Sequence, residues 1–258
     1  ATQSADCSVY GGLTGKRAHR LNQITLERFH SMIVADRKPI EEIIGYLKDH
    51  KNILILGCNE CVTVCEAGGK KEVGVLASAL RMYFLKGERE GDSRVTIEEH
   101  TLERQCDHEY LEEIRDDIDR FDAVISLACG VGVQFMAEKY PKPVYPGLNT
   151  TFLGAVEELG VYTERCQACG NCKVGKFGGI CPFARCAKRV LNGPCGGSTN
   201  GKCEISKDVD CAWQLIVDRL KLLGKLDTYE DLTPIKDWST DRAGGPRKLV
   251  REDVQHDS

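Results

Sequence analysis

The sequence lacks the long apolar runs, the basic surplus and the secretory leader that mark several large classes of protein. No stretch of the chain approaches the roughly 18 consecutive apolar residues that a membrane span requires, so we expect no span. The formal net charge of −4 argues against a general nucleic-acid binder, which usually presents a strongly basic face. The first residues, 1–7, carry neither the basic start nor the apolar stretch of a signal peptide, and we expect a cytoplasmic protein.

Patterns of acid–base or nucleophilic catalysis are also missing. The six histidines are scattered and show no Ser/His/Asp arrangement. Residues 11–17 have neither the glycine spacing nor the Ser or Thr after lysine of a phosphate-binding P-loop. Cys129-Gly-Val-Gly132 is either a flavin-binding turn or, more simply, a close approach of backbone to a metal cluster. We therefore predict no catalytic residues in this chain.

Cysteine is the residue that the sequence has in excess, with 14 among 258 residues. Disulfide-rich scaffolds are typically short secreted chains, whereas this chain is long and has ordinary core-forming segments. We interpret the cysteines as ligands of iron-sulfur clusters in an electron-transfer protein. For any single cysteine the alternative is a small buried hydrophobic residue. Only Cys7 stands apart from the others.

Hydrophobic periodicity predicts an α/β fold. Residues 23–50 show helical spacing with a break at Lys38-Pro39, which indicates two short helices in an N-terminal segment, 1–50. Strand-like and helical segments then alternate, which predicts a small Rossmann-like parallel sheet domain over residues 51–160 with helices on both faces. The predicted strands are 52–56, 94–97, 122–127 and, more weakly, 143–145, and the predicted helices are 73–85, 109–120 and 133–140.

A second region begins where this periodicity stops, near Tyr162. Gly, Pro and Cys dominate from there to Cys211, and few large apolar side chains remain to build an ordinary core. We predict a Cys-rich metal or cluster module over residues 161–224, ordered by ligand bonds rather than by hydrophobic burial. A helix at 213–223 closes the module, and a polar C-terminal arm, 225–258, follows it.

Five cysteines of the first domain are expected at one edge of its sheet. Ligands of open parallel sheets bind beyond the carboxyl ends of the strands, and Cys58, Cys106 and Cys129 follow three of the predicted strands. Cys61 and Cys65 are four residues apart and would share one helical face just after the first strand. One four-iron cluster needs four thiolates, and the spacing does not reveal which of the five is spare.

The Cys-rich module contains a ligation pattern similar to that of ferredoxins. Cys166, Cys169 and Cys172 are each separated by two residues, and Cys181 is followed by Pro182. Eight residues precede the Cys-Pro pair where a ferredoxin has three, so only the ligation pattern transfers. The last four thiols hold either a further four-iron cluster or a zinc ion. They are Cys186, Cys195, Cys203 and Cys211.

Basic side chains outnumber acidic ones in the module. Between Glu164 and Glu204, seven Lys and Arg residues face only those two acids. Nearby cations would stabilise a negatively charged cluster and raise its reduction potential. The alternatives are a solvated face and a docking patch for an acidic partner. The basic residues are Arg165, Lys173, Lys176, Arg185, Lys188, Arg189 and Lys202.

Several motifs together resemble the iron-sulfur small subunit of the methylenetetrahydrofolate reductase of acetogens and related bacteria. The string Asn192-Gly-Pro-Cys-Gly-Gly197 is the most specific of them. The motifs that carry the resemblance lie at residues 57–69, 104–106, 127–134, 166–172, 179–182, 191–197 and 201–204.

The resemblance implies an electron-transfer subunit whose catalytic partner is a separate, flavin-containing TIM-barrel subunit. That partner reduces 5,10-methylenetetrahydrofolate to 5-methyltetrahydrofolate in the one-carbon (Wood-Ljungdahl) pathway, and further redox subunits are possible electron donors. The alternative function is a structural zinc-binding or assembly subunit. The module and the arm around Asp237-Trp238 are the expected docking surface, because an exposed aromatic side chain is a common interface anchor. A plain surface tail is the alternative for the arm.

We accordingly expect two [4Fe-4S] clusters and a third metal centre. One cluster is expected on four of the five thiols of the first domain, and another on Cys166, Cys169, Cys172 and Cys181. The third centre, a cluster or zinc, is expected on the last four cysteines of the module.

Overall fold

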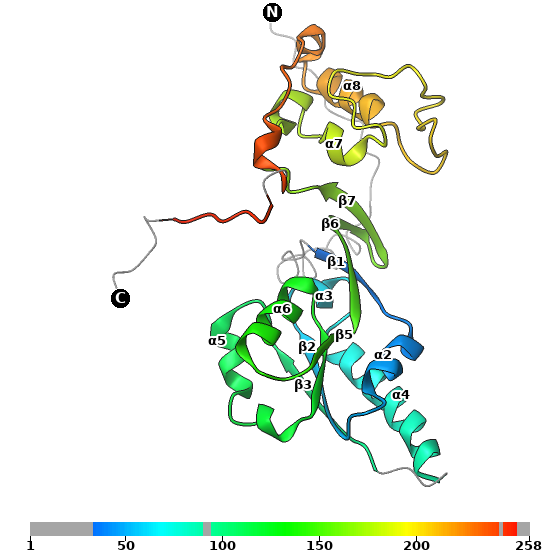
Figure 1. Ribbon diagram of the computed structural model, residues 1–258. Coiled ribbons are helices and arrows are strands. Elements are labelled where there is room, and N and C mark those ends of the chain that lie inside the picture. Colours follow the sequence, from blue (N-terminus) through cyan, green and yellow to red (C-terminus); the bar gives the residue numbers. More distant parts are fainter. Residues whose placement is uncertain (1–32, 90–93, 243–244, 252–258) are drawn as a thin grey trace, which may run out of the picture. The chain divides into compact units, whose positions relative to one another are not determined.

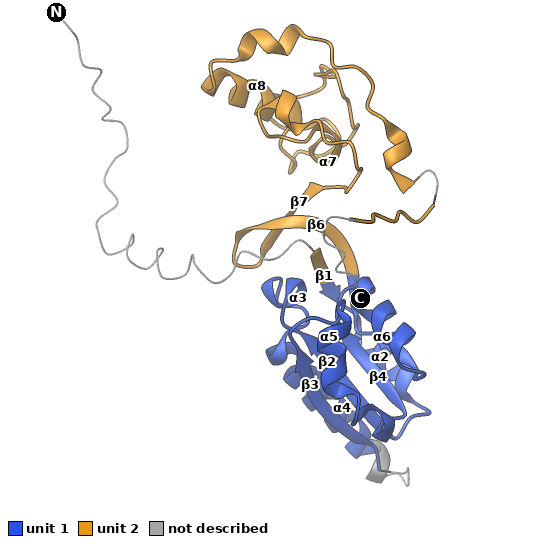
Figure 2. Ribbon diagram, turned by 90° about the vertical axis from the view of Figure 1, so that its left-hand side faces the viewer, with its two compact units in different colours: residues 1–31, 36–149 blue, residues 32–35, 150–258 orange. Residues whose placement is uncertain are grey.

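A computed structural model describes residues 33–89, 94–242 and 245–251 of the chain. The described residues form two compact units, coloured separately in Figure 2: unit 1 is 36–149, and unit 2 is 33–35 together with the residues from Thr150 onward. Cys7 and the glycine-containing segment 11–17, which were assigned no role above, lie outside the described residues.

Unit 1 is built on the predicted parallel sheet. Its four strands lie in the order β3-β2-β4-β5, and all neighbouring strands are parallel. The four strand predictions are therefore confirmed, with shifts of one or two residues at most ends and a longer extension of the second strand. The strands are β2 (Asn52–Cys58), β3 (Thr96–Leu102), β4 (Ala123–Leu127) and β5 (Val144–Pro146).

Burial explains why β2 and β4 are almost entirely apolar. Six of the seven residues of β2 and all five of β4 are buried, as expected for central strands covered on both faces. Ile53 of β2 lies opposite Ile97 of β3 and Ala123 of β4. This register brings the carboxyl ends of the three strands to one edge of the sheet.

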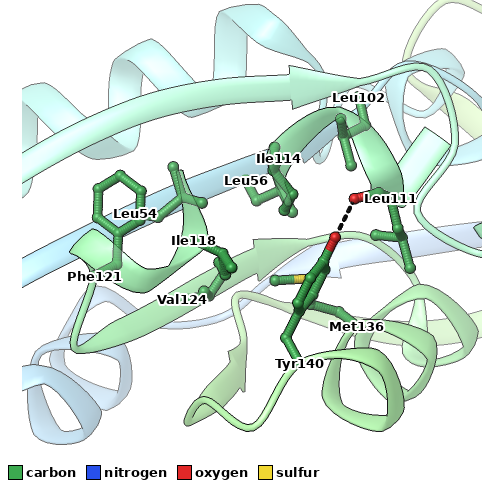
Figure 3. Packing of buried hydrophobic residues seen from close by; sticks show 10 residues of the cluster. All are labelled: Leu54, Leu56, Leu102, Leu111, Ile114, Ile118, Phe121, Val124, Met136 and Tyr140. Carbon is green, nitrogen blue, oxygen red and sulfur yellow. Dashed lines mark hydrogen bonds between the residues drawn. The ribbon is translucent and has the colours of Figure 1, made fainter. Parts of the chain in front are cut away.

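Helices cover both faces of this sheet, with α2 and α4 on one side and α5 and α6 on the other (Figure 1). The cluster drawn in Figure 3 joins Leu54 and Val124 of the strands to Met136 of α6, and the Tyr140 hydroxyl donates a hydrogen bond to the Leu111 carbonyl. The predicted helices 73–85 and 133–140 are confirmed as parts of α4 and α6. The bounds are α2 (Ile40–Leu47), α4 (Lys70–Arg89), α5 (His108–Leu111) and α6 (Gly130–Lys139).

Two helix predictions in this part of the chain need correction. Of the helix predicted between residue 23 and the break at Lys38-Pro39, residues 23–32 lie outside the described residues. Residues 33–37 instead form strand β1 (Ile33–Arg37), which lies beside β6 (Leu148–Glu158) in a second sheet of order β1-β6-β7. The helix predicted over 109–120 is broken into α5 and two 3-10 turns, η1 (Glu112–Ile114) and η2 (Ile118–Arg120). Helical spacing alone does not distinguish a continuous helix from successive turns that bury the same face.

The β6–β7 hairpin was not predicted. Strand β7 (Val161–Cys166) pairs antiparallel with β6, and the register shifts twice along the pair. No residue of β6 after Leu148 is fully buried, and none of β7 is. Without a buried face the hairpin leaves no clean alternation of apolar and polar residues in the sequence.

Unit 2 has a small core of its own beyond the hairpin. Helix α8 (Ala212–Leu222) confirms the helix predicted at 213–223 and buries Trp213, Ile216 and Leu220 against Phe177. The Trp213 indole nitrogen donates a hydrogen bond to the Val190 carbonyl at 3.0 Å. Four short elements complete the unit: η3 (Val174–Phe177), α7 (Pro182–Arg185), η4 (Leu226–Glu230) and η5 (Trp238–Thr240). Within the described ranges, no helix has both the length and the apolarity that crossing a membrane requires.

Candidate functional site

The carboxyl edge of the parallel sheet carries three of the predicted ligands. Cys58 is the last residue of β2, and Cys129 is the N-cap of α6, two residues after β4 ends. Cys106 lies in the loop after β3. Cys58 pairs with Leu102, the last residue of β3, so the strand ends are level and all three cysteines follow them at this edge.

A single turn, α3 (Cys61–Val64), supplies the other two cysteines of unit 1. The Cys65 amide donates to the Cys61 carbonyl at 3.4 Å, which places the two residues one turn apart, as the spacing predicted. Cys65 is buried, and its thiol donates to the Val62 carbonyl at 3.5 Å. Cys61 is half-buried.

At least four of these five thiols interact electrostatically. Burial raises the pKa of the Cys58 thiol, and the neighbouring Cys106 and Cys129 raise it further. Burial likewise raises the pKa of Cys106, with added contributions from Cys129 and Cys61. Mutual repulsion of this kind acts between groups that are close together. Cys58, Cys61, Cys106 and Cys129, here called the edge thiols, therefore form one interacting set.

Gln105 fixes the loop that carries Cys106. Its side chain is fully buried, and its amide nitrogen donates to the carbonyls of Leu56 and Gly57 at 2.8 and 2.9 Å. Its amide oxygen accepts from the Ser126 hydroxyl at 2.7 Å. One side chain thus ties the β3 loop to the ends of β2 and β4. No role for Gln105 was predicted beyond its place in the motif 104–106, although a polar residue directly before a candidate ligand was the available signal.

A glycine allows the β2 loop to pack against the end of β4. The Gly68 carbonyl accepts from the Cys58 amide at 3.0 Å. A Cβ atom on Gly68 would lie 1.9 Å from the Leu127 carbonyl oxygen, which is far inside van der Waals contact. Only glycine fits there, and the packing holds Cys58 in place.

The first candidate centre of unit 2 lies on the loop after β7. Cys166 is the last residue of β7, and its sulfur accepts a hydrogen bond from the Ala168 amide at 3.3 Å. Gly170 has a φ of +79°, and a Cβ atom there would lie 2.6 Å from the Thr240 carbonyl oxygen. Glycine adopts a positive φ at little cost, so Gly170 suits this turn of the loop.

Cys181 begins the second loop of this centre. It is the N-cap of α7, and its sulfur accepts from the Ala184 amide at 3.4 Å. Pro182 occupies the first turn of α7, where its missing N–H leaves no carbonyl unpaired. Amide groups directed at Cys166 and Cys181 suit sulfur atoms that carry negative charge.

The last four cysteines lie on turns beside α8. Cys203 and Cys211 are held by backbone bonds, from the Cys203 amide to Val209 and from the Cys211 amide to Gly201, at 2.9 and 2.8 Å. Cys186 and Cys211 pack against the small core of unit 2, and Cys195 is exposed. The structure thus places two of this predicted quartet at the core and one at the surface.

A comparison with protein families falls on this part of the chain. Residues 145–239 match the family model described as methylene-tetrahydrofolate reductase C terminal. This matched segment contains all eight cysteines of the Cys-rich module, together with Trp238. The edge thiols lie outside it. Comparisons with curated proteins and with solved structures returned no significant match.

Two buried polar atoms of the matched segment have no hydrogen-bond partner. They are Nη1 of Arg165, next to Cys166, and Oδ1 of Asn171, next to Cys172. The other terminal nitrogen of Arg165 donates to Glu157. A buried guanidinium nitrogen without an acceptor is costly, and an anionic group held by the neighbouring thiolates would supply one. The residues of this loop therefore fit a metal-thiolate centre.

Ion pairs partly neutralise the basic excess of the matched segment, and two of them use acids outside the 164–204 window. Arg165 pairs with Glu157, Lys188 with Glu204, and Lys202 with Asp210. Burial lowers the pKa of Arg185, and the nearby positive charge of Arg165 lowers it further. The predicted asymmetry is thus smaller in the structure than in the sequence.

No disulfide bond joins any two of the thirteen described cysteines. In the same part of the chain, no group of three or more His, Cys, Asp or Glu side chains is arranged to hold a metal ion. Three other observations point to metal. They are the interacting edge thiols, the amide groups directed at sulfur, and the buried Nη1 atom of Arg165 that has no hydrogen-bond partner.

Proposed function

We propose that this chain is the iron-sulfur electron-transfer subunit of a methylenetetrahydrofolate reductase. The matched segment supports a relation to folate reductases, because its family model is named for the C-terminal part of such an enzyme. The electron-transfer role goes further and rests on the chain's own residues.

The observation that carries this role is the gathering of the edge thiols at one end of a parallel sheet. Open α/β sheets bind their ligands at this edge, and here cysteines rather than acid–base side chains follow the strands. Cys129 precedes the N-terminus of α6, whose dipole favours a thiolate. Burial and neighbouring thiols raise the pKa of Cys58 and Cys106, and a cation such as iron would stabilise the thiolate forms that are disfavoured in this way.

We assign the edge thiols to one [4Fe-4S] cluster and Cys166, Cys169, Cys172 and Cys181 to another. Cys186, Cys195, Cys203 and Cys211 hold a third centre, either a cluster or zinc. When bound, the clusters accept and release single electrons. The protein holds the thiolates, directs amide groups at the sulfur atoms of Cys166 and Cys181, and buries Cys58 and Cys129.

The catalytic partner in this proposal is a flavin-containing TIM-barrel subunit that binds the folate. Trp238 supports the arm as a docking surface, because the residue remains 38% exposed. Its ring makes a T-shaped contact with the ring of Phe183, and the two ring centres are 5.3 Å apart. We assign the complex to the cytoplasm, where reducing conditions keep thiolates free of disulfides. Upstream redox subunits would supply the electrons.

Counting iron, sulfide and zinc in anaerobically purified protein tests the proposal. We expect about eight iron atoms per chain, or about twelve if the third centre is also a cluster, because each cubane holds four. We expect Cys129→Ala to lower the count by about four, and Cys65→Ala, the matched control at the same sheet edge, to leave it unchanged. Zinc without iron in the wild-type chain would refute the electron-transfer role. Equal iron loss in both variants would refute the choice of edge thiols.

A further inference from the structure

A buried lysine lies directly beside the loop of Cys166, Cys169 and Cys172. Lys236 is only 2% exposed, although lysine is almost never fully buried unless its charge is paired. Lys236 belongs to the segment that the sequence suggested would be a polar arm.

The ammonium group of Lys236 contacts neutral groups. It donates to the carbonyls of Cys169 and Asp237 at 2.9 and 3.2 Å, and it lies 4.5 Å from the centre of the Trp238 ring. None of the ion pairs in the described part of the chain involves Lys236. The exposed Asp237 carboxylate accepts from the amide and hydroxyl of Ser239 at 2.9 and 2.6 Å, and these bonds, followed by the charge of Lys236, lower the pKa of Asp237.

Two neighbouring side chains bind the same loop. The Thr240 hydroxyl donates to the Cys169 carbonyl at 2.9 Å, and the Arg247 guanidinium donates to the Ala168 carbonyl at 2.5 Å. Trp238 packs against Phe183, two residues after Cys181. The described residues of segment 236–247 therefore contact both loops of the first candidate centre of unit 2.

Burial of a lysine charge among carbonyls and an aromatic ring leaves much of its lost hydration uncompensated. An anion close to the Cys169 backbone would offset that cost. We propose that Lys236 is the fixed positive charge of the centre held by Cys166, Cys169, Cys172 and Cys181, and that it raises the reduction potential of that centre. This inference rests on the proposed function, since it requires a cluster on those thiolates.

The physical consequence has a definite sign. One electron added to a cluster with four thiolates makes it more negative by one unit, and a cation nearby stabilises that reduced form. Only the electron moves, from an external reductant such as dithionite, and no bond to Lys236 forms or breaks. A substitution that removes the positive charge at position 236 should therefore lower the midpoint potential of the centre. A substitution that retains the charge should leave the potential unchanged.

A redox titration of the anaerobically purified full chain, followed by electron paramagnetic resonance, tests this role. The signal that disappears in Cys172→Ala identifies the centre. For Lys236→Met we expect the ratio of reduced to oxidised centre at a fixed potential to fall about tenfold, which corresponds to about 59 mV for a one-electron couple. Lys236→Arg should keep the wild-type value.

Two controls separate charge from loop geometry. Thr240→Val removes a neutral hydrogen bond to the same Cys169 carbonyl, and Lys221→Met removes an exposed positive charge on α8. Both should leave the potential at the wild-type value.

Four results would overturn or support the inference. An unchanged potential in Lys236→Met with full iron would overturn it, and so would an equal shift in Thr240→Val. If Lys236→Met loses the iron of this centre, retention of both iron and potential in Lys236→Arg supports the inference, whereas iron loss in both variants overturns it. Absence of iron from the wild-type chain would instead overturn the proposed function. The iron count of the wild-type chain shows this result before any variant is made.

Discussion

Replacing Gln105 with methionine removes the side chain that ties together three strand ends, without leaving a large cavity. In the wild-type chain the Gln105 amide pairs with the carbonyls of Leu56 and Gly57 and with the Ser126 hydroxyl. Methionine has a similar size but offers no comparable donor or acceptor. The substitution therefore leaves these three groups at the buried end of the sheet without this partner.

The expected destabilisation follows from those three bonds. A buried polar group that loses its partner costs about 1–3 kcal/mol. The two carbonyl oxygens each keep a second lone pair, and Ser126 still accepts from the Ala128 amide at 3.3 Å, so the lower part of the range applies. We expect unit 1 to lose about 2–5 kcal/mol, a large share of the roughly 5–15 kcal/mol that stabilises a typical domain.

Hydrogen exchange measured by mass spectrometry is the appropriate assay. Both tryptophans, Trp213 and Trp238, lie in unit 2, so fluorescence would report the other unit. We expect amides of β2 and β4 to exchange about thirty-fold faster or more, since each 1.4 kcal/mol is a factor of ten. The control is Gln134→Met, which removes an exposed glutamine from α6 and should change exchange less than about three-fold.

The same variant should also lose the iron of the edge thiols, because the loop carrying Cys106 is no longer fixed. Exchange in Gln105→Met as slow as in Gln134→Met would refute the role of Gln105 in the sheet. Fast exchange with full iron would refute its role in positioning Cys106.

Two further substitutions test other contacts. Gly170→Ala forces a side chain onto a backbone with a φ of +79° and against the Thr240 carbonyl, so we expect a cost of about 1–3 kcal/mol and faster proteolysis of segment 236–247. Asp122→Asn removes a carboxylate whose pKa is held below its ordinary value of 3.8 by two amide groups at the start of β2. Because that pKa is lowered in the folded chain, the stabilisation is present at neutral pH and is lost as the pH falls below about 4, so the difference in urea midpoint between wild type and Asp122→Asn should shrink there.

The contrary results are equally specific. If segment 236–247 is cleaved in Gly170→Ala at the same rate as in the wild type, its order does not depend on the close approach at Gly170. A difference between wild type and Asp122→Asn that grows as the pH falls would contradict the lowered pKa of Asp122.

The central strands were predictable because their apolar runs are long and are bounded by polar turns. Strand β1 was not, because it is formed by pairing with the distant strand β6, and the β6–β7 hairpin was not, because its residues are largely exposed. The single helix predicted over 109–120 failed for a related reason. A chain that buries Leu111, Ile114 and Ile118 in successive short turns has the same apolar spacing as a helix.

The candidate ligands were found from cysteine spacing, and the parallel order of the strands was enough to place them at one sheet edge. Spacing did not select among Cys58, Cys61, Cys65, Cys106 and Cys129, since five thiols satisfy it equally. The mutual electrostatic effects that join the edge thiols appear only once the chain is folded, because Coulomb interactions depend on distance in space and on burial.

The sequence by itself determined the α/β class of unit 1, the helix α8 and the two groups of cysteines, because these follow from local apolar periodicity and from residue spacing. Only the tertiary structure decided that Gln105 joins three strand ends and that Lys236 lies buried against the Cys169 carbonyl. Both are polar residues whose partners lie tens of residues away along the chain. The identity of a polar residue does not reveal whether its side chain binds water or a buried carbonyl, because the tertiary structure determines its hydrogen-bond partner.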